Sequence, residues 1–215
     1  MTIELWGIGT PRTFRPIWVL EEVGTPYAIR AIGPRTGETQ TADFTALNRK
    51  QKVPFLSDRQ VRLSESLAIC RYLIEAFPVA GIWRPETLEE RTKLDEWCCY
   101  IYGELDETAL YVMRRHRDLA HIFGDAPAAL TSSREYLVRQ LAILADGLDP
   151  AATIMPQGFS LADILLISCL DWAKSYDVGL PGSLDRYRAK IAERPAYQRA
   201  MNKNYVMKAS DHGTS

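Results

Sequence analysis

Cysteine and histidine are scarce in this chain of 215 residues, and their positions exclude several kinds of site. None of the four cysteines forms a Cys-x-x-Cys pair, and the three histidines lie away from them, so we expect no metal site. The cysteines lie in apolar, helix-like surroundings, which favours inert buried thiols in a reducing cytoplasm. They are Cys70, Cys98, Cys99 and Cys169. Because none precedes position 70, the beginning of the chain cannot supply a protein thiol.

An excess charge and a long apolar run are also missing. The 26 Lys and Arg residues nearly balance the 27 Asp and Glu residues, so a formal net charge of -1 offers no basic field for nucleic acid or an anionic membrane. The most apolar segment, residues 161–172, contains two aspartates and is too short to span a bilayer. Glu4 interrupts the apolar stretch after Met1, which does not fit a signal peptide. We therefore expect a soluble cytoplasmic protein without nucleic-acid or membrane partners.

Strand and helix signals alternate in the first part of the chain. Short strands are predicted over residues 3–6 and 27–32, with a helix between them that ends before Gly24. A hairpin over 53–63 and a helix over 64–77 follow. This order is a βαβ unit followed by ββα.

The composition changes after Pro78. Strand signals almost vanish, and the remaining patterns are helical over residues 89–121, 127–148, 161–176 and 184–203. We predict an α/β domain over residues 1–79, a linker over 80–88 and an all-α helical-bundle domain over 89–215.

The turn after the first strand is the first candidate site. Backbone N–H groups and the helix dipole at the segment Gly9 to Arg15 favour a bound anion, including a thiolate. In the alternative interpretation, Thr10 or Thr13 only caps the helix. The two interpretations are compatible, because a capping hydroxyl accepts a bond from the helix and can still donate its proton outward.

Two further segments suit a peptide-like ligand. Pro54 stands at the entrance to a hairpin strand, where a cis bond would leave the Val53 backbone open to an extended ligand; it is otherwise a plain strand-starting proline. At the start of the helix over 64–77, Ser66 suits a carboxylate and Glu65 an ammonium group, which together match the head of an amino acid. The alternative for this segment is again a helix cap.

Together these motifs resemble the cytosolic glutathione S-transferase family, in its bacterial, serine- or threonine-dependent rather than tyrosine- or cysteine-dependent form. The order is a Thr-Pro turn, a Val-Pro-Phe-Leu strand, a Ser-Glu-Ser helix start, a linker and a helical region. The capping box Ser160-Leu161-Ala162-Asp163 is similar to that of the family's central helix. Residues 193–200 look like its carboxyl-terminal signature, and the resemblance covers about residues 2 to 203.

The resemblance implies a thioredoxin-like first domain that binds glutathione. Glu65 and Ser66 would hold the γ-glutamyl end, and the Val53 backbone before a cis Pro54 would pair with the cysteinyl part. Lys52 would lie near the glycyl carboxylate or the backbone of glutathione.

The resemblance also implies that a hydroxyl before the proline donates to the glutathione sulfur, which indicates Thr10, with help from Arg12. No tyrosine precedes Tyr27, so the tyrosine-dependent classes do not fit. A helix that begins after Thr13 would put Pro16 in its first turn, where a proline costs little, and would make Thr13 the rival donor.

The second substrate would meet an apolar wall. The residues that could form this wall are Ile8, Phe14, Tyr102, Leu105, Tyr111 and Met113. In the alternative interpretation, they are only core or dimer contacts. The function implied is a glutathione S-transferase that activates the thiol for attack on a small hydrophobic electrophile, or a related peroxidase or disulfide reductase. We expect a homodimer that uses glutathione as co-substrate and no other cofactor. The alternative is a binding or assembly module without turnover.

Overall fold

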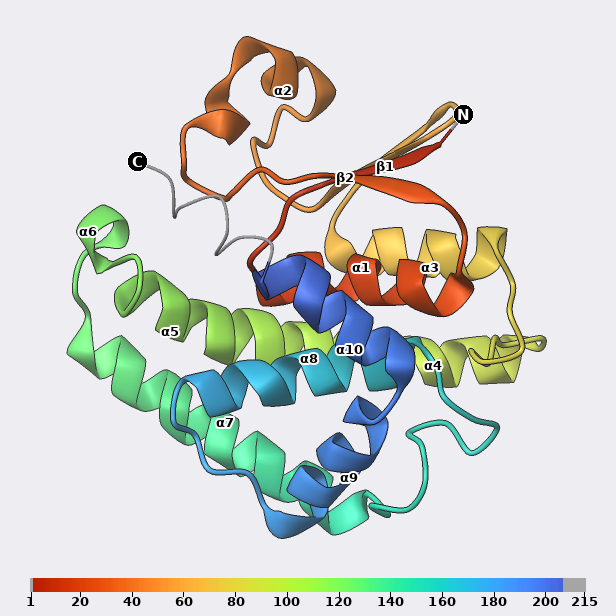
Figure 1. Cartoon of the computed structure of the whole chain (residues 1–215). Helices are drawn as coiled ribbons and strands as arrows, with labels where there is room; N and C mark the ends of the chain where they lie inside the picture. Colours follow the sequence, from red (N-terminus) through yellow and green to blue (C-terminus); the bar gives the residue numbers. More distant parts are fainter. Residues whose placement is uncertain (1, 207–215) are drawn as a thin grey trace. The chain divides into compact units, whose positions relative to one another are not determined.

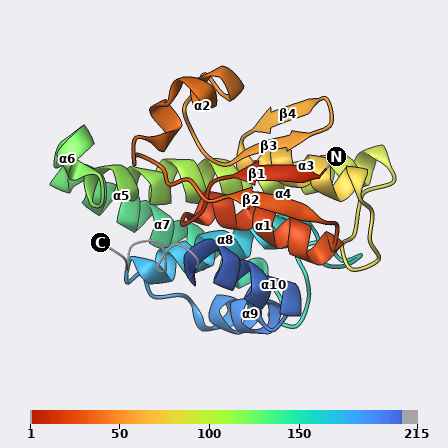
Figure 2. The same cartoon turned by 45° about the horizontal axis from the view of Figure 1, so that its top comes forward.

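The computed structural model describes residues 2–206 (Figure 1), whose strands form one sheet in the order β2-β1-β3-β4, which is visible in Figure 2. The strands are β1 (Ile3–Trp6), β2 (Tyr27–Arg30), β3 (Phe55–Asp58) and β4 (Val61–Ser64). β1 pairs in parallel with β2 and antiparallel with β3, and β3 and β4 form the antiparallel hairpin. The predicted βαβ-ββα order is confirmed. β3 begins two residues later than predicted, because the paired register starts after Pro54, which has no N–H to donate.

Helices cover the two faces of this sheet. α1 (Pro11–Val23) and α3 (Ser66–Ala76) pack together on one side, and α2 (Ala42–Leu47) lies on the other (Figure 1). Alternate side chains of β1 point to opposite faces, which buries Ile3 and Leu5 on one side. On the other face, Trp6 meets Phe55 edge to face. A short 3-10 turn, η1 (Glu38–Gln40), precedes α2.

The start of α1 settles one of the open alternatives. Thr10 is the N-cap, and its side chain and that of Thr13 each accept the other's backbone N–H in a capping box. The helix therefore begins at Pro11 and Pro16 lies inside it, so the alternative start after Thr13 is wrong. The reciprocal cap stabilises this earlier start.

The described chain divides into two compact units, of which the first comprises residues 2–84 and 193–206. The last described elements, α10 (Pro195–Met201) and the π-helical segment η3 (Asn202–Val206), thus belong with the sheet and not with the helical region to which the sequence assigned residues 193–203. Figure 2 shows α10 alongside α1. The physical reason is an aromatic contact: the ring of Tyr197 stands edge to face on both Phe14 and Trp18.

Ion pairs strengthen the same contact. Arg194 donates to both carboxylate oxygens of Glu22, at 2.6 and 2.8 Å. Arg199 and Lys203 both donate to the carboxylate of Glu21, at 2.7 and 2.6 Å. We call these five residues the C-terminal clasp, because they join the end of the described chain to the last turn of α1.

The second unit, residues 85–192, is helical. Its elements are α4 (Leu88–Tyr100), the π-helical segment η2 (Ile101–Leu110), α5 (Tyr111–His116), α6 (Ala120–Phe123), α7 (Pro127–Gly147), α8 (Leu161–Ser175) and α9 (Gly182–Ala192). α8 is buried along almost its whole length and packs against α4, η2 and α9. Cys99 on α4 is exposed, against the expectation of four buried thiols. Adjacent residues on a helix point about 100° apart, and on α4 this turn carries the side chain from the core at Cys98 to solvent at Cys99.

Asp163 organises the start of α8. It accepts hydrogen bonds from the Ser160 N–H and hydroxyl, both at 2.8 Å, from the Ile154 N–H at 2.9 Å and from the Tyr187 hydroxyl at 2.5 Å. Burial raises the pKa of Asp163, and these hydrogen bonds lower it in part. The predicted capping box is confirmed, and it additionally ties α8 to α9 and to the preceding loop.

Candidate active site

The end of β1 brings two of the predicted segments together. Gly7 has φ +113°, in the region that favours glycine. A Cβ at this position would lie 2.5 Å from Cβ of Val53 and 2.8 Å from Cγ2 of Thr13. Val53 before the proline and the first turn of α1 are therefore neighbours, and the missing side chain of Gly7 permits their approach.

The amide groups at the start of α1 are largely used within the protein. The Thr10 and Thr13 N–H groups each donate to the other residue's hydroxyl oxygen at 3.0 Å. The Gly9 N–H donates to both the carbonyl oxygen and Oδ1 of Asn204, at 2.9 and 3.0 Å. The expectation that the amides of this turn hold an anion is therefore wrong for these three groups. These three amides are therefore not free to hold a ligand sulfur.

The two threonine hydroxyls differ in what surrounds them. Oγ1 of Thr13 is fully buried and lies 2.8 Å from Oδ1 of Asn204 and 2.9 Å from the Thr10 carbonyl oxygen, which are both acceptors. The Thr10 hydroxyl lies 3.0 Å from Oγ1 of Thr13, and the residue retains 4% exposure. Each hydroxyl has one proton to donate. Of the two, Thr10 is the residue that still reaches the surface.

The bond between Val53 and Pro54 is cis, as the sequence suggested. The preceding carbonyl, that of Lys52, accepts a hydrogen bond from Nδ2 of Asn48 at 2.8 Å. Within residues 2–206, the Val53 backbone makes no hydrogen bond. Its N–H and C=O are thus available to an extended ligand next to the start of α1.

Glu65 and Ser66 lie at the start of α3. Glu65 is the N-cap residue of α3, and its backbone φ of 74° is unusual for a residue other than glycine. Such backbone strain is concentrated at functional sites. Nζ of Lys50 donates to its carboxylate at 2.7 Å. This hydrogen bond lowers the pKa of Glu65, burial opposes it, and the charges of Lys50, Arg12 and Lys52 add to the lowering. A ligand ammonium group would therefore compete with Lys50 for Glu65.

Ser66 is not a helix cap, because no side chain caps α3. It is 1% exposed, and Nη1 of the fully buried Arg15 donates to its hydroxyl oxygen at 3.3 Å. A buried guanidinium beside a hydroxyl favours a carboxylate. The sequence analysis gave Arg15 no role, although a charged residue between the apolar Phe14 and Ile17 was a signal that could have found it.

The candidates for the apolar wall occur in both units. Ile8 and Phe14 are buried in the first unit, where Phe14 packs against Trp18 and Tyr197. In the second unit, Leu105 and Met113 are buried, whereas Tyr102 on η2 and Tyr111 on α5 are half-buried. The electrophile pocket stays a prediction, and the two tyrosines are its more accessible members.

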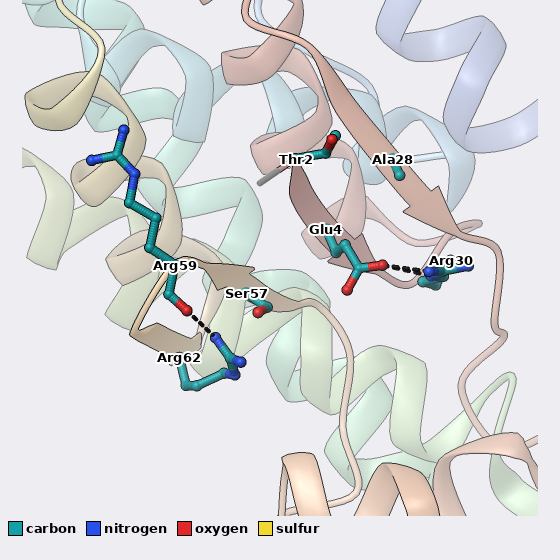
Figure 3. A pocket seen from close by; sticks show the side chains of 7 residues that line it. All are labelled: Thr2, Glu4, Ala28, Arg30, Ser57, Arg59 and Arg62. Carbon is teal, nitrogen blue, oxygen red and sulfur yellow. Dashed lines mark hydrogen bonds and ion pairs between the residues drawn. The ribbon is translucent and has the colours of Figure 1, made fainter.

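A separate hollow of about 550 Å³ lies on the face of the sheet to which Glu4 of β1 points, opposite the face that buries Ile3 and Leu5 (Figure 3). Its lining residues are Thr2, Glu4, Ala28, Arg30, Ser57, Arg59 and Arg62. Arg30 pairs with Glu4, and the Arg62 guanidinium donates to the Arg59 carbonyl, as the dashed lines show. None of the predicted site residues lines this hollow, so we do not assign it to the candidate active site.

Two other features are absent from the part of the chain that the structure describes. Residues 2–206 contain no group of three or more His, Cys, Asp or Glu side chains placed to hold a metal ion. Among the helices of this range, none combines the length and apolar character that crossing a membrane requires.

The first unit thus has a thioredoxin-like fold with a cis proline beside the start of its first helix, and a helical unit follows it. Residues 1–75 match the family model described as the N-terminal domain of glutathione S-transferase. The glutathione S-transferase GstA of Escherichia coli O157:H7 is 30% identical over 165 residues, which cover 74% of this chain and 77% of that protein. The chain belongs to the glutathione S-transferase family.

Another relative and a solved structure are also glutathione transferases. Glutathione S-transferase theta-1 of Bos taurus is 28% identical over 78% of this chain and 69% of its own length. A glutathione transferase from Pseudomonas putida, solved with one glutathione disulfide bound per subunit, superimposes with a TM-score of 0.80. It is 22% identical and the match covers 93% of this chain and 90% of that one. The predicted fold class, a thioredoxin-like domain followed by a helical domain, is confirmed.

Proposed function

We propose that this protein is a glutathione transferase that activates the thiol of glutathione for attack on a small hydrophobic electrophile. The observation that carries the proposal is the close approach, at Gly7, of the start of α1 and the Val53 backbone before cis Pro54. The start of α3 belongs to the same unit and packs against α1. The names of the relatives support the same activity.

The charges of the candidate site suit glutathione, which carries two carboxylates and one ammonium group. In the proposed arrangement the γ-glutamyl carboxylate lies at Ser66, with Arg15 behind it, and the ammonium group lies at Glu65. The cysteinyl part pairs with the Val53 backbone, and Lys52 attracts the glycyl carboxylate. Three positive charges, those of Arg12, Lys50 and Lys52, act on Glu65 and favour an anionic ligand.

The reaction requires the protein to lower the pKa of the glutathione thiol. The nucleophile is the thiolate, and the thiol proton passes to water. The Thr10 hydroxyl donates a hydrogen bond to the sulfur, and the charge of Arg12 adds to the stabilisation. Lowering the thiol pKa by one to two units requires about 1.4–2.7 kcal/mol, which is within reach of one hydrogen bond to a charged group. The thiolate then forms a carbon–sulfur bond with the electrophile as the bond to the leaving group breaks and that group departs with its electron pair, as chloride does from chlorodinitrobenzene, and no further cofactor takes part.

The serine- or threonine-dependent type, with Thr10 as donor, is part of this proposal. Thr10 retains exposure, whereas Thr13 is fully buried, which favours Thr10 as the catalytic residue. Homodimer formation and a cytoplasmic location are proposed from the family resemblance. The apolar wall that Tyr102 and Tyr111 would contribute to belongs to the proposal as well.

A binding module without turnover is the second candidate. The observation in its favour is the low exposure of Thr10 together with the internal use of the Gly9, Thr10 and Thr13 amides. Both candidates require glutathione binding, so they differ only in whether the bound thiol reacts.

Two measurements on the full chain test the proposal. Retention on immobilised glutathione, with elution by free glutathione, measures binding, and conjugation of chlorodinitrobenzene measures turnover. We expect retention and a conjugation rate above that of the uncatalysed reaction. Retention without conjugation would favour the binding module, and failure to bind would overturn both candidates.

A further inference from the structure

Asn204 is a polar side chain in the C-terminal segment that reaches the candidate sulfur site from 191 to 195 residues away in sequence. It is fully buried, and its contacts go to Gly9, Thr10 and Thr13 at the start of α1. The sequence analysis did not single it out. Burying an amide side chain is costly unless its polar groups are satisfied, and here they are.

The partners determine which way the amide of Asn204 is turned. The Gly9 N–H is a donor and must face Oδ1, at 3.0 Å. The Thr10 carbonyl is an acceptor and must face Nδ2, at 3.0 Å. Because Oδ1 only accepts, the Thr13 hydroxyl at 2.8 Å must donate its proton to Oδ1.

Counting acceptor positions leads to the same assignment. A carbonyl oxygen has two lone pairs, and that of Thr10 receives the Phe14 N–H at 3.0 Å and Nδ2 of Asn204. The Thr13 proton is therefore directed to Oδ1 and away from the Thr10 carbonyl, although that carbonyl lies only 2.9 Å away. With its proton committed, Thr13 faces the Thr10 hydroxyl only as an acceptor. The proton of Thr10 then has two places to go: the oxygen of Thr13 or an acceptor outside.

We propose that Asn204 is a positioning residue: by holding the Thr13 proton and the first turn of α1, it leaves the Thr10 hydroxyl to donate to the glutathione sulfur. The C-terminal clasp supports this role, because Lys203 and Arg199 anchor the segment next to Asn204 to Glu21 on α1. The inference rests on the proposed function of the site, and it adds a residue that acts on the sulfur through Thr10.

The test compares Asn204→Ala with Asn202→Ala, a matched change at an exposed position of the same segment. The pKa of enzyme-bound glutathione is measured from the ultraviolet absorbance of its thiolate as a function of pH, and the affinity for S-methylglutathione is measured in parallel. We expect Asn204→Ala to raise the thiol pKa by about one unit, which means about tenfold less thiolate below that pKa. The affinity for S-methylglutathione, which has no thiol proton, should change less than about threefold, and Asn202→Ala should change neither quantity. An unchanged thiol pKa would overturn the proposal.

Asn204→Asp keeps the proposal testable if the Asn204→Ala variant does not fold. Its carboxylate still accepts from Gly9 and Thr13, but it cannot donate to the Thr10 carbonyl and it adds a negative charge near the sulfur. We expect the thiol pKa to rise with this variant as well, and an equal or lower pKa would count against the role of Asn204.

A double-mutant cycle with Thr10→Val separates positioning from a general structural effect. If Asn204 acts through Thr10, the Asn204 substitution should add little to the thiol pKa once the hydroxyl is gone. Fully additive shifts would overturn the proposed route. Loss of glutathione binding in the unsubstituted protein would instead refute the proposed function, so the two failures are distinguishable.

Discussion

The C-terminal clasp should make the docking of α10 and η3 on α1 depend on pH through the Glu21 carboxylate. The Glu21 carboxylate is 7% exposed and accepts from Arg199, Lys203 and the Tyr27 hydroxyl, at 2.6 to 2.7 Å. Burial raises the pKa of Glu21, but the hydrogen bonds from Lys203, Tyr27 and Arg199 outweigh it, so the pKa lies below its ordinary value. A carboxyl whose pKa falls on folding stabilises the folded state above its unfolded pKa. That stabilisation is lost as the pH falls through the folded pKa.

The size of the effect depends on the exposure of the partners. Breaking a fully buried pair costs about 3–5 kcal/mol, and exposed pairs contribute about 0–1 kcal/mol. The side chains of Arg199 and Lys203 are 52% and 40% exposed, so solvent screens their half of the clasp. We therefore expect Glu21→Gln to weaken the docking of the C-terminal segment by about 1–2 kcal/mol near neutral pH.

Hydrogen exchange of the backbone amides in α10 and η3 measures this docking directly, because local opening exposes them. Glu21→Gln should speed their exchange by about tenfold near neutral pH, since 1.4 kcal/mol corresponds to a factor of ten. The ratio between variant and unsubstituted protein should shrink as the pH falls through the lowered pKa of Glu21 in the folded state, because the carboxyl is then protonated and loses its charge. Glu135→Gln, at an exposed position of α7, is the control and should leave exchange unchanged. A ratio that stays constant with pH, or no acceleration at all, would refute the reasoning.

Three further predictions concern other parts of the chain. Gly7→Ala should lower the free energy of unfolding by about 2 kcal/mol or more and reduce retention on immobilised glutathione, because the added Cβ would overlap Val53 at an unfavourable φ. Normal stability and normal retention would contradict the close approach described at this turn. Ser66→Ala should weaken glutathione binding by about 1–2 kcal/mol in calorimetry, with Ser132→Ala, at an exposed position of α7, as the unaffected control. Asp163→Ala should lower the free energy of unfolding, measured by denaturant titration, by about 2–4 kcal/mol, because the buried N–H and O–H donors around it lose their acceptor. The control is Asp146→Ala, at an exposed position of α7, and an equal loss of stability in both variants would show that the capping network is dispensable.

Much of the fold was predictable because its signals are local. The alternation of β1, the glycine after α1 and the Ser160 to Asp163 capping box depend on residues a few positions apart. Their physical chemistry operates in any protein that contains them, so the order of strands and helices could be predicted from the sequence. The pairing of Thr10 with Thr13 is local in the same way.

The contacts of the candidate site that were missed depend on distant segments. Neither the bond from Arg15 to Ser66 nor the contacts of Asn204 with the start of α1 has a signal in the spacing of residues, since 51 and more than 190 positions separate the partners. The boundary of the first unit was missed for the same reason. An edge-to-face aromatic contact and a set of ion pairs bring α10 to α1, and no local pattern reports such a contact.

By itself, the sequence determined the types and order of the elements, the cis proline that was suspected at position 54 and the family to which the chain belongs. Capping, turn formation and hydrophobic periodicity act over a few residues and can be recognised without coordinates. Only the tertiary structure showed that Thr10 retains slight exposure while Thr13 is fully buried, and that Asn204 lies within hydrogen-bond distance of the start of α1. Hydrogen-bond direction depends on the position of every donor and acceptor around a group, and packing places them together from both ends of the chain.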